Sequence, residues 1–158
     1  MKRSSESDKI EIALYQPDIP QNTGAIMRLS ACLGIKLHII EPTGFYMDDK
    51  RMSRVTMDYL EYLDLEKHNS WDAFYNSSKK QSKRLILATT KSSLSYLDFN
   101  FIPGDIILFG RESSGVPDNI HSICDSRIKI LMQNNIRSFN VASSCAIIVS
   151  ESIRQINK

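Results

Sequence analysis

Three separate segments of the sequence combine glycine or small residues with polar side chains that could bind a ligand or assist a reaction. They are 22–28 (NTGAIMR), 108–117 (LFGRESSGVP) and 130–144 (ILMQNNIRSFNVASS). Glycine lets the backbone approach a ligand closely or adopt a positive φ. Carboxamide, carboxylate and guanidinium groups can orient a substrate or stabilise a charge that develops during a reaction. Each segment is therefore a candidate part of a binding or catalytic site.

Each segment also has an ordinary structural interpretation. Asn22 could cap a helix on which Arg28 is a solvated side chain, and Glu112 could be a surface charge at a tight strand-to-helix turn. Asn140 or Ser138 could cap the last helix. The second segment matches neither the GxGxxG pattern nor a phosphate loop, so a dinucleotide or a nucleoside triphosphate is poorly supported. Taken singly, no segment establishes a function.

Strands that alternate with helices would position these segments. Apolar runs predict strands at 10–15, 36–40, 84–90, 105–109 and 128–132, with an ambiguous short strand at 59–65. Capping residues and apolar spacing predict helices from about Asn22 to Cys32, from Asp48 or Asp49 to about Met57, after Ser70, and over 141–156. This alternation predicts an α/β fold whose parallel sheet is covered on both faces. Open sheets of this kind bind ligands at the carboxyl ends of their strands, where Arg28 is expected.

Length and composition fit one ordinary domain. The chain has 158 residues, of which 42% are hydrophobic and 24% charged, and its net charge of +2 is too small to indicate a nucleic-acid partner. We expect a flexible tail over residues 1–9 and one domain over 10–158. An odd number of cysteines, Cys32, Cys124 and Cys145, without CxxC spacing, argues against disulfides and a zinc site and fits a reducing cytosol. No apolar run predicts a membrane span, and the polar start predicts no secretory signal.

In order and spacing, the three segments resemble the three motifs of the SPOUT class of S-adenosylmethionine-dependent RNA methyltransferases. The resemblance covers about 10–155. It is closest to the small group that methylates the ribose 2′-hydroxyl of the tRNA wobble nucleotide, position 34, a cytidine or modified uridine. The narrower resemblance is carried by 37–42 (LHIIEP), 44–45 (GF) and 48–51 (DDKR). It implies a single-domain parallel-sheet SPOUT fold with a C-terminal trefoil knot, in a cytoplasmic homodimer with the final helix at its interface.

The resemblance also implies roles for individual residues. S-adenosylmethionine, without a metal, would be contacted largely by backbone at Ala88, Gly110, Ile130 and Ser138. The residues implied in catalysis are Arg28, Asn22, Glu112 and Asn140. A guanidinium stays protonated, so Arg28 is better suited to hold a phosphate and stabilise the developing oxyanion than to act as a base. The other three would orient Arg28, and Glu112 could pair with it.

Basic residues near one end of a predicted helix are the candidate tRNA contacts. Lys50, Arg51 and Arg54 would bind the anticodon stem-loop, although a solvated helix face is the simpler alternative. A second basic cluster is interpreted as a solubilising loop: Lys79, Lys80, Lys83 and Arg84. The final helix carries an apolar stripe that fits either a core or an interface: Cys145, Ile148, Val149 and Ile153.

Two other functions stay open at this point. The chain could methylate another RNA ribose or a base, or it could be a non-catalytic RNA-binding module with the same fold. The intact set of four catalytic candidates argues against the non-catalytic module. The three histidines are conceivable bases but lie in none of the three segments, and the simpler interpretation is that they are surface residues on a strand, in a loop and at a helix edge: His38, His68 and His121.

Overall fold

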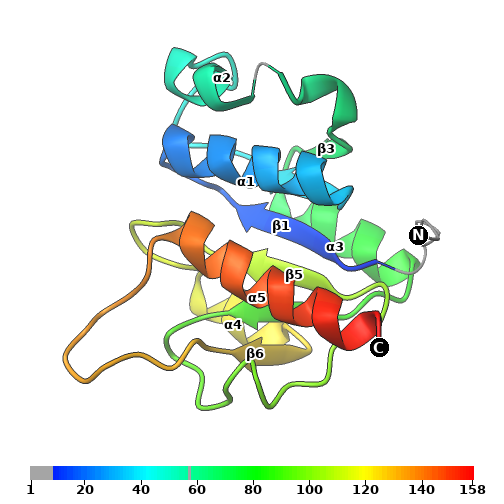
Figure 1. Cartoon of the computed structure of the whole chain (residues 1–158), viewed down its shortest axis with the longest axis vertical. Coiled ribbons are helices and arrows are strands. Elements are labelled where there is room, and N and C mark those ends of the chain that lie inside the picture. Colours follow the sequence, from blue (N-terminus) through cyan, green and yellow to red (C-terminus); the bar gives the residue numbers. More distant parts are fainter. Residues whose placement is uncertain (1–8, 57) are drawn as a thin grey trace.

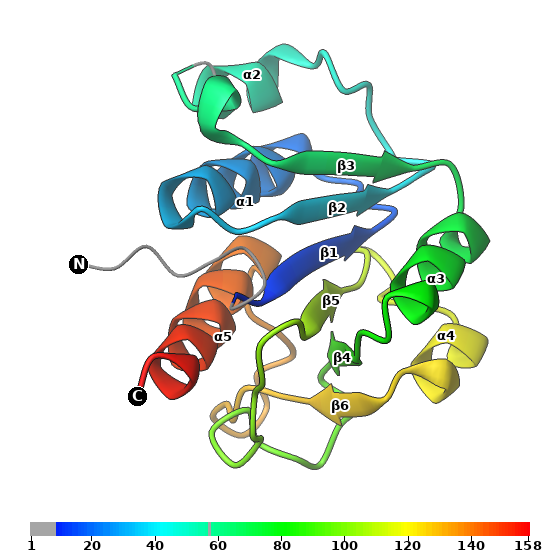
Figure 2. The ribbon, with the colours of Figure 1, turned by 90° about the vertical axis from the view of Figure 1, so that its right-hand side faces the viewer.

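A computed structural model describes residues 9–56 and 58–158 of the chain. The predicted tail over 1–9 lies outside this part except for Lys9. Six parallel strands form one sheet (Figure 1), in the order β3-β2-β1-β5-β4-β6 (Figure 2). The strands are β1 (Glu11–Tyr15), β2 (Leu37–Ile40), β3 (Leu65–His68), β4 (Leu85–Ala88), β5 (Ile106–Phe109) and β6 (Ser126–Ile128). The predicted α/β class with a parallel sheet is confirmed, and the trefoil knot stays a prediction.

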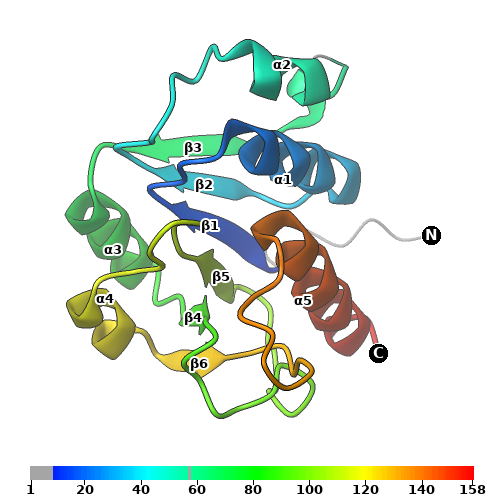
Figure 3. The same cartoon turned by 90° about the vertical axis from the view of Figure 1, so that its left-hand side faces the viewer.

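Helices cover both faces of this sheet, as predicted. Helices α1 (Pro20–Leu33) and α5 (Val141–Ile156) lie side by side on one face. Helices α3 (Trp71–Lys80) and α4 (Asp118–Ile123) lie on the other, as the views along the sheet show (Figures 2 and 3). Helix α2 (Lys50–Thr56) packs on α1, and the 3-10 helix η2 (Leu60–Tyr62) follows it. No helix in the described part of the chain is long and apolar enough to cross a membrane.

Alternate residues of the buried strands supply two separate hydrophobic layers. Ile12 and Ile107 pack with α1 and α5, whereas Ala13 and Leu108 pack with α3 and α4. The apolar stripe of α5 belongs to the first layer, because Cys145, Ile148 and Val149 are at most 1% exposed within a single chain. The sequence left open whether this stripe forms core or an interface, and these three residues form core.

Several element boundaries differ from those predicted. Helix α1 begins at Pro20, because proline suits the first helical position, so Asn22 lies inside the helix and does not cap it. The predicted strand at 59–65 is wrong: η2 occupies part of it, and β3 follows at Leu65–His68. The strand predicted at 128–132 overlaps β6 only at Ile128. The short helix α4 is not predicted by the sequence patterns.

Candidate active site

A cavity of about 570 Å³ opens at the carboxyl ends of β4, β5 and β6. Its volume lies within the range of small-molecule pockets, and its place at the strand ends is where open α/β sheets bind ligands. All four predicted cofactor residues line it: Ala88, Gly110, Ile130 and Ser138. Ala88 ends β4, Gly110 directly follows β5, and the other two lie in the long loop between β6 and α5. The structure thus brings these four positions together, and their binding role stays a prediction.

The backbone around Gly110 is packed too closely for a side chain. A Cβ atom at this position would lie 2.7 Å from both the Cα and the carbonyl carbon of Gly115. The two ends of this loop are joined by reciprocal backbone hydrogen bonds between Arg111 and Gly115, of 3.0 and 2.8 Å. A side chain at position 110 would therefore push away the backbone at Gly115, which forms part of the cavity wall.

Three of the four catalytic candidates form one hydrogen-bonded chain on the cavity wall. The Asn140 Nδ2 atom donates to Asn22 Oδ1 at 2.8 Å, and Asn22 Nδ2 donates to Glu112 Oε1 at 3.5 Å. Asn140 Oδ1 also accepts from the backbone N–H groups of Ala142 and Ser143, at 2.9 and 3.2 Å, so it caps α5. One residue from each of the three sequence segments is thereby fixed relative to the other two.

The Glu112 carboxyl, at the end of this chain, lies in a partly buried environment. Burial raises the pKa of Glu112 above its ordinary value, and the neighbouring Asp18 carboxylate adds to this rise. The Glu112 Oε2 atom accepts from the backbone N–H of Asp18 at 3.0 Å, so the carboxyl also holds the turn before α1. The Glu112 carboxyl is positioned by backbone and by Asn22, which suits a residue that orients its neighbours.

Arg28 does not join the other catalytic candidates. It is exposed on α1, its guanidinium carbon lies 4.8 Å from the centre of the Tyr59 ring, and it is not among the residues that line the cavity. Glu112 bonds to Asn22 and Asp18 instead, so the expected pairing of Glu112 with Arg28 is not found in this structure. The guanidinium lies about one and two-thirds turns beyond Asn22 on the same helix and is accessible to a molecule larger than the cavity.

Some residues at the site were not assigned from the sequence. Arg111 lines the cavity, and its Nε atom lies 3.6 Å from Asp18 Oδ2. The sequence signal that could have identified Arg111 is its position next to Gly110 in the segment 108–117. His121 lines the cavity with a buried Nε2 atom that has no hydrogen-bond partner in the described residues. His38 and His68 are buried in β2 and β3, which corrects the interpretation of these histidines as surface residues.

The two basic clusters differ in how their charges are paired. Arg51 donates to both carboxylate oxygens of Asp49, at 3.0 and 2.8 Å. Lys50 and Arg54 are exposed and form no ion pair within the described residues. The second cluster is not the solubilising loop that was expected, because three of its residues form ion pairs within the chain. The pairs are Lys79 with Asp125, Lys83 with Glu11, and Arg84 with Asp105. Among the three candidate tRNA contacts, Lys50 and Arg54 are therefore the two whose charges are unpaired within the described residues.

The chain is similar to known proteins over most of its length. Residues 9–150 match the model of the SpoU rRNA Methylase family. A tRNA (cytidine(34)-2′-O)-methyltransferase from Beijerinckia indica subsp. indica is 47% identical over 145 residues, which cover 92% of this chain and 91% of that protein. One similar structure was solved in work on the 2-OH methylation of C/U34 on tRNA; it has a TM-score of 0.89 and 34% identity, over 94% of this chain and 97% of that one.

A more distant structure shares the fold. It is the SpoU methyltransferase AviRb from Streptomyces viridochromogenes in complex with AdoMet, with a TM-score of 0.86 and 22% identity over 94% of this chain and 61% of that one. The family match extends over most of the chain and includes all three segments that build the cavity wall. The chain therefore belongs to the SpoU rRNA Methylase family.

Proposed function

We propose that this protein transfers a methyl group from S-adenosylmethionine to the ribose 2′-hydroxyl of the tRNA wobble nucleotide, position 34, a cytidine or modified uridine. The observation that carries the proposal is the convergence of the three sequence segments on one cavity, with Glu112, Asn22 and Asn140 in a single hydrogen-bonded chain. The 47% identity to a tRNA (cytidine(34)-2′-O)-methyltransferase supports the choice of nucleotide. The three cysteines are free, which suits a reaction in the reducing cytosol.

The reaction would be an in-line displacement: the 2′-oxygen would form a bond to the methyl carbon, the bond from that carbon to sulfur would break to leave S-adenosylhomocysteine, and the hydroxyl proton would pass to solvent. The cofactor supplies a methyl carbon that is already electrophilic, so no metal is needed for activation. The protein must mainly align the reacting atoms. Asn22, Glu112 and Asn140 fix the wall against which the nucleotide sits. Arg28 holds the adjacent phosphate and stabilises the negative charge that develops on the oxygen.

Nucleoside mapping by mass spectrometry tests this function directly. In tRNA from cells that lack the protein, we expect the 2′-O-methyl group at position 34 to disappear and to return with the unmodified chain. A wobble ribose that stays methylated would contradict the proposal. Loss of a methyl group at another position would identify a methyltransferase with a different site, and no change in any RNA would favour a non-catalytic module.

Replacement of Asn140 with alanine should cost both stability and turnover. Loss of the α5 cap, and of the partner of Asn22, should lower the free energy of unfolding by about 1–2 kcal/mol. Ser70→Ala is the matched control, because Ser70 Oγ caps α3 by accepting from Ala73 N–H at 3.1 Å. We expect a similar loss of stability in Ser70→Ala with unchanged methyl transfer. Chemical denaturation and single-turnover assays would separate the effects, and equal turnover in both variants would remove Asn140 from catalysis.

The exposed charges of α2 should bind tRNA phosphates without reading sequence. Loss of two phosphate contacts in Lys50→Ala/Arg54→Ala should weaken binding of all tRNAs similarly and flatten the slope of log affinity against log salt by about 1.4–1.8 units. Lys80 is an exposed residue of α3, and the control variant Lys80→Ala should leave the slope unchanged. Binding isotherms over a salt series measure this slope. A loss confined to the cognate tRNA would make these residues determinants of specificity.

We expect the chain to act as a homodimer. The buried stripe of α5 cannot supply the interface, but large apolar side chains near the cavity are 40–63% exposed: Ile19, Phe139, Ile136 and Leu131. Exposed apolar groups that gather in this way mark interaction surfaces. Light scattering at micromolar concentration should give twice the mass of one chain, and Ile136→Glu should shift it toward a single chain. A single-chain mass for the unmodified protein would contradict the dimer.

A further inference from the structure

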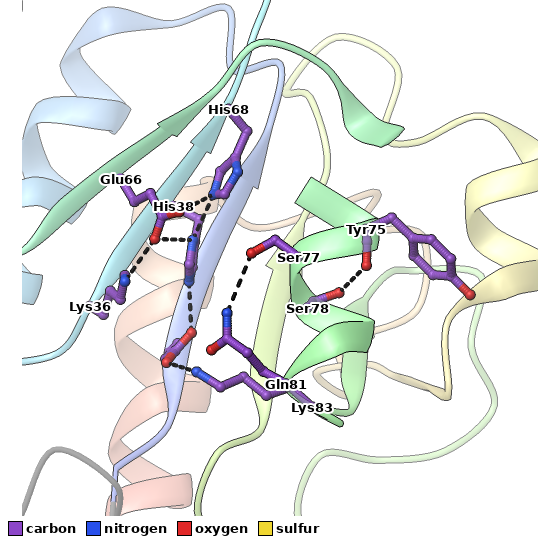
Figure 4. A network of polar contacts seen from close by, with 10 residues as sticks. Lys36, His38, Glu66, His68, Tyr75, Ser77, Ser78, Gln81 and Lys83 are labelled. Atoms are coloured by element: carbon purple, nitrogen blue, oxygen red, sulfur yellow. Dashed lines mark hydrogen bonds and ion pairs between the residues drawn. The ribbon is translucent and has the colours of Figure 1, made fainter. Parts of the chain in front are cut away.

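A polar cluster that the proposed reaction does not use lies on the α3 side of the sheet (Figure 4). It consists of His38 on β2 and of Glu66 and His68 on the neighbouring strand β3. Glu66 pairs in register with His38, and side chains two residues apart on a strand share a face, so all three side chains converge. The two imidazoles are only 7% and 6% exposed, and none of the three residues lines the active-site cavity.

The donor atoms of the cluster have the spacing of a metal site. The ligand atoms of the three residues lie within 4.8 Å of one another. His38 Nδ1 lies 2.9 Å from His68 Nε2, and these two nitrogens lie 3.9 and 3.8 Å from the nearest Glu66 oxygens. Two ligands of a tetrahedral zinc ion lie about 3.4 Å apart, since each is about 2.1 Å from the metal. The observed separations lie on both sides of this value.

We propose that His38, His68 and Glu66 bind a zinc ion, with a water molecule as the fourth ligand. Shifts of about half an ångström would bring the three donors to tetrahedral spacing. Glu66 can close its own two separations, because its side chain is 40% exposed at the rim of the cluster, and the two imidazole nitrogens must move apart by about half an ångström. Its Oε2 atom is held by Lys36 at 2.7 Å, which leaves Oε1, the oxygen nearest His68, for the metal.

The surroundings of His38 prepare it to coordinate through Nδ1. Its other nitrogen, Nε2, lies 2.7 Å from the carboxylate of Glu11, which Lys83 also contacts. A histidine that binds a metal commonly donates its second N–H to a carboxylate in this way, which fixes its tautomer and ring orientation. The ring of Phe74 packs against both imidazoles, with centroid distances of 5.5 Å to His38 and 5.2 Å to His68. Both rings are therefore held close to each other before an ion arrives.

Metal binding would replace the hydrogen bond that now joins the two imidazoles. Without an ion, the His68 Nε2 proton can be shared with His38 Nδ1. With an ion bound, both of these nitrogens coordinate, and the His68 proton resides on its Nδ1 atom. The zinc would join β2 to the edge strand β3 and act as a structural clamp, remote from methyl transfer.

Zinc titration of the full-length, chelator-stripped protein in competition with a chromophoric chelator tests the proposal. The control is Glu61→Gln, since Glu61 is exposed on η2 and lies outside the cluster. We expect one zinc per chain in the unmodified protein and in Glu61→Gln, and at least about tenfold weaker binding in Glu66→Gln. Glu66→Gln keeps the buried histidine pair, so it should fold even if a His68→Ala variant does not. Far-UV circular dichroism would verify this.

A cobalt(II) spectrum adds a geometric readout. The unmodified protein should show the intense visible bands of tetrahedral cobalt, and Glu66→Gln should lose them. Equal zinc affinities in the unmodified protein and Glu66→Gln, or a spectrum of octahedral aquo-cobalt, would overturn the proposal and leave a hydrogen-bonded histidine pair. Because the site is separate from the cavity, S-adenosylhomocysteine should bind equally with and without zinc. A change in this affinity would contradict a purely structural clamp.

Discussion

Gly110→Val should weaken binding of S-adenosylhomocysteine by about 100-fold or more. Even the Cβ atom of the new side chain would lie 2.7 Å from backbone atoms of Gly115, and backbone cannot rotate aside as a side chain can. The loop from Gly110 to Gly115, which forms one wall of the cavity, must then move away from β5. Overpacking of this kind costs about 3 kcal/mol, which corresponds to about a 100-fold change in a dissociation constant.

Isothermal calorimetry with S-adenosylhomocysteine measures this effect. Gly104→Ala is the control: Gly104 has a φ of 89°, and a Cβ there would meet nothing within 4 Å. It should reduce stability through backbone strain and leave cofactor affinity unchanged, because Gly104 lies outside the cavity lining. If Gly110→Val bound with normal affinity, the close packing of Gly110 on Gly115 would have no part in cofactor binding.

Arg28→Ala should reduce turnover on tRNA by about 100- to 1000-fold, the range seen when a group that stabilises a developing oxyanion is removed. Affinity for S-adenosylhomocysteine should stay within a few-fold of normal, because Arg28 does not line the cavity. Arg28→Lys should recover only part of the turnover, since an ammonium keeps the charge and loses the planar donor pair of a guanidinium. Single-turnover kinetics at saturating tRNA report the effect on the chemical step.

Tyr59→Leu separates catalysis from the structural role of Arg28. The Arg28 guanidinium stacks on the Tyr59 ring at 4.8 Å, so Tyr59→Leu removes this contact and keeps the charge. We expect near-normal turnover in Tyr59→Leu. If both variants lost turnover equally, Arg28 would act by holding η2 and α2 in place. If Arg28→Ala had near-normal turnover, Arg28 would be a surface residue of α1.

Local sequence patterns determined the type and bounds of those helices and strands that depend mainly on their own residues. Helix α5 has the predicted bounds, Val141–Ile156, because its capping residue and apolar period lie within one segment. Apart from Glu11, strands β1 and β5 are apolar runs whose residues are buried on both faces. The proximity of Ala88 and Gly110 was also predictable, since neighbouring parallel strands end at the same edge of the sheet. For these features, short-range periodicity carries the necessary information.

Tertiary structure decided what depends on a partner distant in sequence. The apolar run at 128–132 ends as a strand at Ile128, because Ala88 is the last residue with which β4 can pair. Strand β3 lies at Leu65–His68 because β2 offers partners only there. Glu112 bonds to Asn22 and the Asp18 backbone, and not to Arg28. Lys83 and Arg84 pair with acidic residues that no local pattern associates with them, Glu11 and Asp105. A hydrogen bond or ion pair needs two groups at contact distance, and residues far apart in sequence reach that distance only when the sheet has assembled.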